Sequence, residues 1–142
     1  MDNAHLELAI SLAVEGHRGQ VDKVGAAYIL HPLRVMQRQR TIPGMIVGVL
    51  HDWMEDCGGT PDVLYRYGFT SEIVESILCL TKRKGENYDL FIDRVMAGPA
   101  LALPVKIADV EDNSDRTRIV DPNEEDFARW AKYERALARM RA

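Results

Sequence analysis

Apolar residues recur at helical spacing along most of the chain, and no segment shows the alternation expected of a strand. Near the N-terminus, Leu6, Ala9, Ile10 and Ala13 recur at intervals of three and four residues. That spacing places all four on one face of a helix. A preceding Asp2 or Asn3 is a plausible helix cap. The hydrophobic pattern therefore predicts an all-α fold.

The same spacing predicts the remaining helices and one long loop. Residues 19–27 are expected to form the loop. A helix that starts at Pro43 should run through His51 and stop at Gly58-Gly59. We expect residues 103–113 to be irregular around Pro104 and helical near Asp109. Further helices are predicted over 31–39, from 60–61 onward, over 71–80, 88–96 and 124–141, the last with a buried stripe of Phe127, Trp130, Leu137 and Met140.

Length and charge narrow the class of protein. A chain of 142 residues is predicted to form one domain over 1–142, and 46% hydrophobic residues can bury a core. The net charge of −4 argues against a nucleic-acid partner, which normally meets a basic face. A local basic pocket for a phosphorylated small molecule stays open, because net charge says little about one cleft. The sequence does not predict an oligomeric state.

The two cysteines suggest a reducing compartment. Cys57 and Cys79 are far apart and form no metal or redox motif, so we expect two reduced, packed thiols. The first residues show no signal pattern, and no apolar run is long enough to span a bilayer. These features together predict a cytoplasmic protein without membrane contact.

The chemistry concentrates around a His51-Asp52 doublet, followed within one turn by Glu55 and Asp56. Imidazole nitrogen with carboxylate oxygen suits manganese, iron or zinc better than calcium. In one continuous helix all four side chains would project from one side. The two later acids would then position and deprotonate a water. The alternative for Asp56 is a solvent-facing acidic end of the helix.

Two ligands leave a metal site incomplete, and His31 and Asp109 are candidates for the third and fourth. Each has an ordinary alternative: His31 as a turn histidine beside Pro32, Asp109 as a surface acid of its helix. His17 ends an apolar stripe, so we interpret it as a packed core histidine.

An ordered set of motifs extends this pattern from His17 to Asn113. The chain resembles the HD-superfamily hydrolase domain of the RelA/SpoT stringent-response enzymes, above all the stand-alone small alarmone hydrolases. The motifs are His17-Arg-Gly-Gln20, Tyr28-Ile-Leu-His31-Pro-Leu33, Leu50-His-Asp-Trp-Met-Glu-Asp56, Leu80-Thr-Lys82 and Lys106-Ile-Ala-Asp109 with Asn113.

The resemblance implies a compact HD-domain helical bundle with Mn²⁺ held by His31, His51, Asp52 and Asp109. It implies catalysis by Glu55 and Asp56. The implied reaction is hydrolysis of the 3′-pyrophosphate of ppGpp or pppGpp, which yields GDP or GTP and pyrophosphate. For this nucleotide we expect contacts from Lys23, Asn113 and Arg116, although Arg116 also fits a solvated surface position.

Two departures from the family pattern bear on the substrate. Asp22 stands where the family usually has the arginine of an Arg-Lys pair, and residues 110–115 are more acidic than usual. Two other functions therefore stay open. One is an HD-class phosphatase for another nucleotide, such as a deoxynucleoside monophosphate or NADPH. The other is a catalytically silent module that binds a nucleotide.

Overall fold

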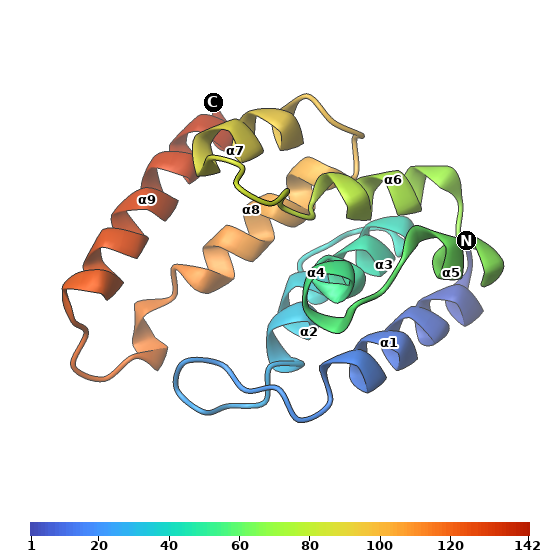
Figure 1. Ribbon diagram of the computed structural model, residues 1–142, viewed down its shortest axis with the longest axis horizontal. Helices are drawn as coiled ribbons and strands as arrows, with labels where there is room; N and C mark the ends of the chain where they lie inside the picture. The colour runs from blue at the N-terminus through green and yellow to red at the C-terminus, as the bar shows by residue number, and fades with distance from the viewer.

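Helices make up most of the molecule, and a long loop joins α1 to α2 (Figure 1). The computed structural model describes residues 1–142, and apart from one isolated bridge between Val21 and Ala27 it contains no β-structure. The all-α prediction is confirmed. The elements are α1 (Asn3–His17), α2 (Leu30–Gln37), α3 (Ile42–Leu50), α4 (Trp53–Cys57), α5 (Pro61–Arg66), α6 (Ser71–Cys79), α7 (Tyr88–Met96), α8 (Ala102–Asn113), the 3-10 turn η1 (Arg116–Arg118) and α9 (Glu124–Arg141).

Side-chain caps fix where most helices begin. Asp2 accepts a hydrogen bond from the backbone N–H of His5 at the start of α1. Before α9, Asn123 and Asp126 form a reciprocal capping box. Each cap satisfies backbone donors that have no partner inside the helix. The other side-chain caps are Thr41 of α3, Thr60 of α5, Thr70 of α6 and Asn87 of α7.

Helix α3 is the centre of the main core. It is apolar on all sides, and α1, α2, α6 and α8 pack against it. A Cβ on Gly48 would lie only 3.1 Å from Met36 Cα, so the missing side chain allows α2 and α3 to approach closely. This contact brings the start of α2 and the end of α3 into one region.

The long helix α9 packs on α7 and α8 through a smaller cluster that includes Ala136, Leu137 and Met140. Figure 1 shows α9 beside α8, with the C-terminus close to α7. Trp130, Leu137 and Met140 are buried as predicted, but Phe127 is 52% exposed. That part of the prediction is wrong because only the second half of α9 joins the cluster. Phe127, in the first turn, lies edge-on to Trp130 instead.

Two other helix predictions need correction. The helix expected to run through His51 is interrupted: α3 ends at Leu50, and α4 begins at Trp53. Asp52 between them leaves helical geometry, with φ −102° and ψ 1°. At Pro104 the expected irregularity is absent, because this residue lies in the first turn of α8, where a helix needs no backbone N–H.

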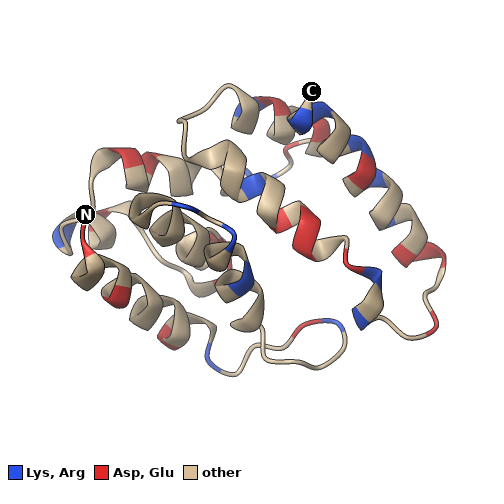
Figure 2. Ribbon diagram, turned by 180° about the vertical axis from the view of Figure 1, so that it is seen from behind, with Lys and Arg blue, Asp and Glu red and all other residues tan.

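Surface composition is mixed. Lysine and arginine alternate with acidic residues along α9 (Figure 2). No helix combines the length and apolar character needed to cross a membrane. Cys57 and Cys79 are both free thiols.

Candidate metal centre

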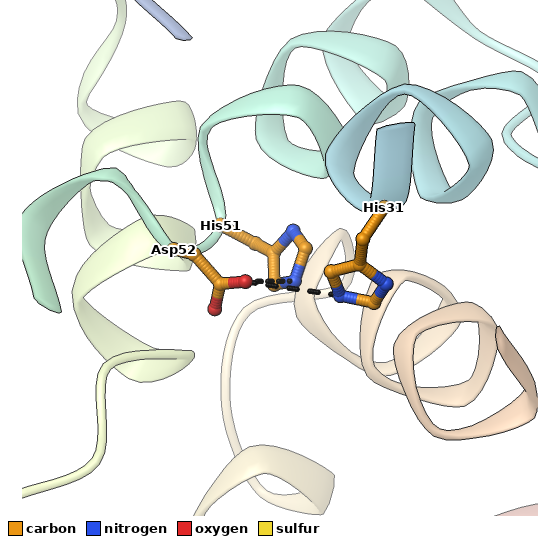
Figure 3. A group of neighbouring side chains, drawn as sticks. All are labelled: His31, His51 and Asp52. Atoms are coloured by element: carbon orange, nitrogen blue, oxygen red, sulfur yellow. Dashed lines mark ion pairs between the residues drawn. The ribbon is translucent and has the colours of Figure 1, made fainter. Parts of the chain in front are cut away.

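Two buried histidines face each other where α2 and α3 meet. His31 lies in the first turn of α2, and His51 directly follows α3. Their ring centroids are 5.2 Å apart. Figure 3 shows both rings with Asp52, which points toward them from the turn between α3 and α4. Donor atoms of these three residues all lie within 4.8 Å of one another.

Asp109 approaches the same point from α8. Its Oδ1 lies 2.9 Å from His31 Nε2 and 3.4 Å from His51 Nε2. Asp52 Oδ2 lies 3.1 Å from His51 Nε2 and 3.7 Å from His31 Nε2. The structure thus brings together all four residues that the sequence nominated as metal ligands, although 78 residues separate His31 from Asp109.

Hydrogen bonds hold the far side of each imidazole. His31 Nδ1 donates to Asp112 Oδ2 at 2.6 Å, and His51 Nδ1 donates to the Gly48 carbonyl at 2.6 Å. A proton on Nδ1 leaves the lone pair of a neutral imidazole on Nε2, which faces the cluster. Histidines that bind metals are commonly oriented in this way by an acceptor behind the ring.

The donor set fits a divalent transition metal. His51 Nε2 is buried and makes no well-aligned hydrogen bond, although oxygens of Asp52 and Asp109 lie 3.1 Å and 3.4 Å away, a costly arrangement for a polar atom. Two imidazole nitrogens and two carboxylates match the mixed nitrogen and oxygen preference of such ions. A cation at this point would bind the unpartnered nitrogen.

Without a metal, protons take the place of the cation. Burial would lower the pKa of His51, but the charges of Asp52 and Asp109 raise it well above 6.5. Burial would likewise lower the pKa of His31, but hydrogen bonds to Asp109 and Asp112 raise it. Burial would raise the pKa of Asp52, but the charge of His51, its hydrogen bond and the charge of His31 together lower it to about 2. The cluster therefore favours a bound positive charge.

Three residues to which the sequence reasoning gave no role surround the centre. The Tyr28 hydroxyl donates to Asp52 Oδ2 at 2.6 Å. Lys106 Nζ donates to Asp109 Oδ2 at 2.9 Å, and Asp112 lies behind His31. Helical spacing could have identified two of them, because Lys106 and Asp112 each lie three residues from Asp109 and share its face of the helix. Nothing local marks Tyr28, because its partner is 24 residues away.

Glu55 and Asp56 lie at the exposed rim, on the short helix α4. Partial burial, together with the negative charge of Asp52, raises the pKa of both carboxyls. Because the chain turns at Asp52, they do not continue the helix that precedes His51. Their position beside the cluster follows from this turn and not from helix periodicity.

A cavity of about 340 Å³ adjoins the cluster. Tyr28 and Asn113 line it and also contact the centre, because Asn113 Nδ2 donates to Asp109 Oδ1 at 3.1 Å. Two residues of the cavity lining thus donate hydrogen bonds to two of the four candidate ligands, Tyr28 to Asp52 and Asn113 to Asp109. Its lining consists of Val21, Asp22, Lys23, Val24, Tyr28, Asn113, Asp115, Arg118, Ile119, Arg129 and Tyr133.

The predicted substrate residues divide into two groups. Lys23 and Asn113 line the cavity. Arg116 is not part of this lining: it pairs with Glu134 at 2.9 Å and lies over the Trp130 ring. The arginines that do line the cavity are Arg118 and Arg129, and Arg129 comes from α9, a helix that the sequence did not connect with the site.

Asp22, the departure from the family pattern, has a structural role in the loop. Its Oδ1 accepts hydrogen bonds from Val24 N at 3.0 Å and Ala26 N at 2.9 Å. The carboxylate thereby stabilises the tight turn that carries Lys23. His17, as predicted, is a buried histidine outside the centre, and its Nδ1 lies 2.8 Å from Gln20 Oε1.

Fold and geometry define an all-helical domain with a buried His/Asp centre beside a polar cavity. No family model matches the chain. Among solved structures it is similar to a metazoan ortholog of SpoT that hydrolyses ppGpp and plays a role in starvation responses. The TM-score is 0.81, the identity is 17%, and the match covers 99% of this chain and 86% of the other. The two proteins share a fold, and the helices of this chain confirm the expected compact all-α bundle.

Proposed function

We propose that the chain is a manganese-dependent hydrolase that releases pyrophosphate from the 3′ position of ppGpp or pppGpp. The observation that carries the proposal is the direct connection between the His/Asp centre and the cavity, through Tyr28 and Asn113. The shared fold with a protein that hydrolyses ppGpp supports the choice of substrate. Fold alone does not fix a substrate, so the experiment below tests it separately.

In this proposal His31, His51, Asp52 and Asp109 would hold one Mn²⁺. A bound divalent ion polarises a phosphoryl oxygen and makes water more acidic. Glu55 at the rim accepts the proton of the attacking water, and Asp56 orients that water. The water oxygen would form a bond to the phosphorus on the ribose 3′ oxygen, the bond between that oxygen and phosphorus would break, and the proton held by Glu55 would pass to the 3′ oxygen, giving GDP or GTP and pyrophosphate.

The cavity supplies the substrate contacts. Lys23, Arg118 and Arg129 bring positive charge to its wall, where they neutralise phosphate oxygens. Asn113 offers an amide that already contacts Asp109. Tyr133 adds an aromatic surface next to Arg129, which suits a nucleobase or ribose.

A second candidate substrate class follows from Asp22 and Asp115. Both acids lie in the cavity wall, where they oppose a highly charged nucleotide. This favours, as the alternative, an HD-class phosphatase for a nucleotide with fewer phosphates, such as a deoxynucleoside monophosphate, or for NADPH. A catalytically silent binding module is less consistent with the acids Glu55 and Asp56 beside the centre.

A product assay with manganese and with a chelator tests the function. Purified protein is incubated with ppGpp, a deoxynucleoside monophosphate and NADPH, and pyrophosphate and phosphate are measured separately. We expect pyrophosphate and GDP from ppGpp, and no product after chelation. Phosphate from another nucleotide with ppGpp intact would favour the second class, and no turnover of any substrate would favour the silent module. The free thiols at Cys57 and Cys79 fit the reducing cytoplasm as the location.

A further inference from the structure

A buried carboxylate outside the proposed ligand set contacts the centre from behind. Asp112 lies on α8 and is 1% exposed. Its Oδ2 accepts a hydrogen bond from His31 Nδ1 at 2.6 Å, on the opposite side of the ring from Asp109. The proposed chemistry uses Asp52 and Asp109 as ligands and Glu55 and Asp56 at the water, so it leaves Asp112 without a task.

Arginines fix the position of this carboxylate. Arg34 Nε donates to Asp112 Oδ1 at 2.7 Å, and its Nη2 donates to Oδ2 at 3.1 Å, a two-pronged contact. Arg118 Nη1 lies 3.5 Å from Oδ1, and Arg38 Nη2 lies 3.9 Å from the same oxygen. Positive charge on several sides offsets the cost of a buried carboxylate and leaves it little freedom to move.

The two histidines of the centre are therefore held by different acceptors. His51 rests on a neutral backbone carbonyl, whereas His31 rests on an anion. A carboxylate behind the ring fixes the Nδ1–H tautomer, orients the ring and makes Nε2 a stronger donor to a metal. The segment 110–115, which looked unusually acidic in sequence, thus contains a residue directed at the centre.

We propose that Asp112 is a positioning residue that orients His31 for metal binding through its own hydrogen bond to Nδ1, while Arg34 and Arg118 offset the cost of its burial. The inference rests on the proposed metal site and concerns how tightly that site binds its ion. Removing such a contact typically weakens metal binding by about 10- to 100-fold.

Asp112→Asn tests this role most directly. We expect the dissociation constant for Mn²⁺, measured by titration calorimetry, to rise about 10- to 100-fold. The visible spectrum of the Co²⁺-loaded variant should differ from that of wild type, because a neutral amide behind the ring no longer makes His31 Nε2 a stronger donor to the metal. With saturating Mn²⁺, the KM for substrate should stay close to wild type. The matched control is Glu111→Gln, which removes an acid from the same helix. The Glu111 side chain contacts Arg141 at the surface, so this variant should leave metal binding unchanged.

A second variant separates positioning from a purely structural role. Arg34→Gln breaks the ion pair between α2 and α8 but keeps the contact between Asp112 and His31. It should lower the melting temperature while changing Mn²⁺ affinity far less than Asp112→Asn does. Equal losses of affinity in both variants would show that Asp112 only joins two helices, and the inference would fall.

The remaining outcomes also decide the question. If Asp112→Asn does not fold, Asp112→Glu keeps the charge and lengthens the side chain. Weaker Mn²⁺ binding in that folded variant supports positioning, and wild-type affinity overturns it. Wild-type protein that binds Mn²⁺ but leaves ppGpp intact would refute the proposed function alone. Unchanged affinity in Asp112→Asn, with ppGpp still hydrolysed, would refute the role of Asp112 alone.

Discussion

At the scale of single residues, the centre depends on what lies behind each side chain. The Nδ1 atoms of His31 and His51 are both occupied by acceptors, so both Nε2 atoms turn inward. Residue types in the sequence pointed to His51 and Asp52 and left His31 and Asp109 as candidates, and the resemblance to a known family completed the set of four. They did not reveal Tyr28, whose partner Asp52 is distant in sequence, or distinguish Arg118 from Arg116. Which arginine reaches the cavity depends on the turn η1, whose conformation has no signature in residue spacing.

Glu55→Gln should retain Mn²⁺ and lose most turnover, because an amide cannot accept the proton of water. A positioned general base typically contributes about 10²- to 10⁴-fold. The test measures kcat and bound Mn²⁺ on the same preparation of the variant. Asp56→Asn is the companion variant, and its effect should be less than additive with Glu55→Gln if the pair acts together. Near-wild-type rates in both single variants would place proton transfer elsewhere.

Asp22→Asn should lower the KM for ppGpp at low salt and affect kcat less. The amide oxygen can still accept from Val24 N and Ala26 N, so the loop keeps its turn while the cavity loses a negative charge. High salt should shrink the difference, because salt screens exposed charges. Asp22→Arg provides the contrast, since it reverses the charge but removes the acceptor. An unchanged KM in Asp22→Asn would show that the loop does not approach the substrate, which would also remove the assigned role of Lys23.

At the scale of elements, caps and periodicity predicted most helices closely. The cap at Asp2 was recognisable because short polar side chains satisfy free backbone donors at helix starts. The break at Asp52 was not predictable, because no proline or glycine marks it. Hydrogen bonding of Asp52 to Tyr28 and its place in the cluster are tertiary effects. The exposure of Phe127 likewise depends on where α9 meets α8.

Gly59→Ala should destabilise the protein through α4. An added Cβ would overlap the buried Trp53 ring, which has little room to move. Overpacking of this kind typically costs about 1–3 kcal/mol, measurable by denaturant unfolding. Activity should fall as well, because α4 carries Glu55. Gly58→Asn is the control: its Cβ meets nothing within 4 Å, and asparagine tolerates the φ of 70°. Equal stability of wild type and Gly59→Ala would contradict the packing described for Trp53.

At the scale of the whole molecule, the main core positions the centre and α9 completes the cavity. The main core joins α1, α2, α3, α6 and α8, which carry or support the candidate ligands. A smaller cluster attaches α9, which contributes Arg129 and Tyr133 to the cavity. Global stability should therefore respond to the charge at the centre.

Metal-free protein should lose stability as the pH rises above about 6.5. The pKa values of His31 and His51 are raised in the folded state, so their protonation stabilises the fold fully below the unfolded pKa. This stabilisation is lost as pH rises through the folded values. Mn²⁺ replaces these protons, so its effect on melting temperature should grow over the same range. Melting curves with chelator and with Mn²⁺ at several pH values test this; a flat metal-free profile would contradict it.

Metal content is the most direct test of the central claim, that His31, His51, Asp52 and Asp109 hold one divalent ion. Each protein is loaded with Mn²⁺ and dialysed, and its metal content is then measured. The proteins compared are wild type, His51→Ala and Asp109→Ala, with His5→Ala as the control for a histidine outside the centre. Circular dichroism of each variant checks that the helices are retained. We expect about one ion per chain in wild type and the control, and little in the other two. Full occupancy with retained activity in both His51→Ala and Asp109→Ala would contradict the account.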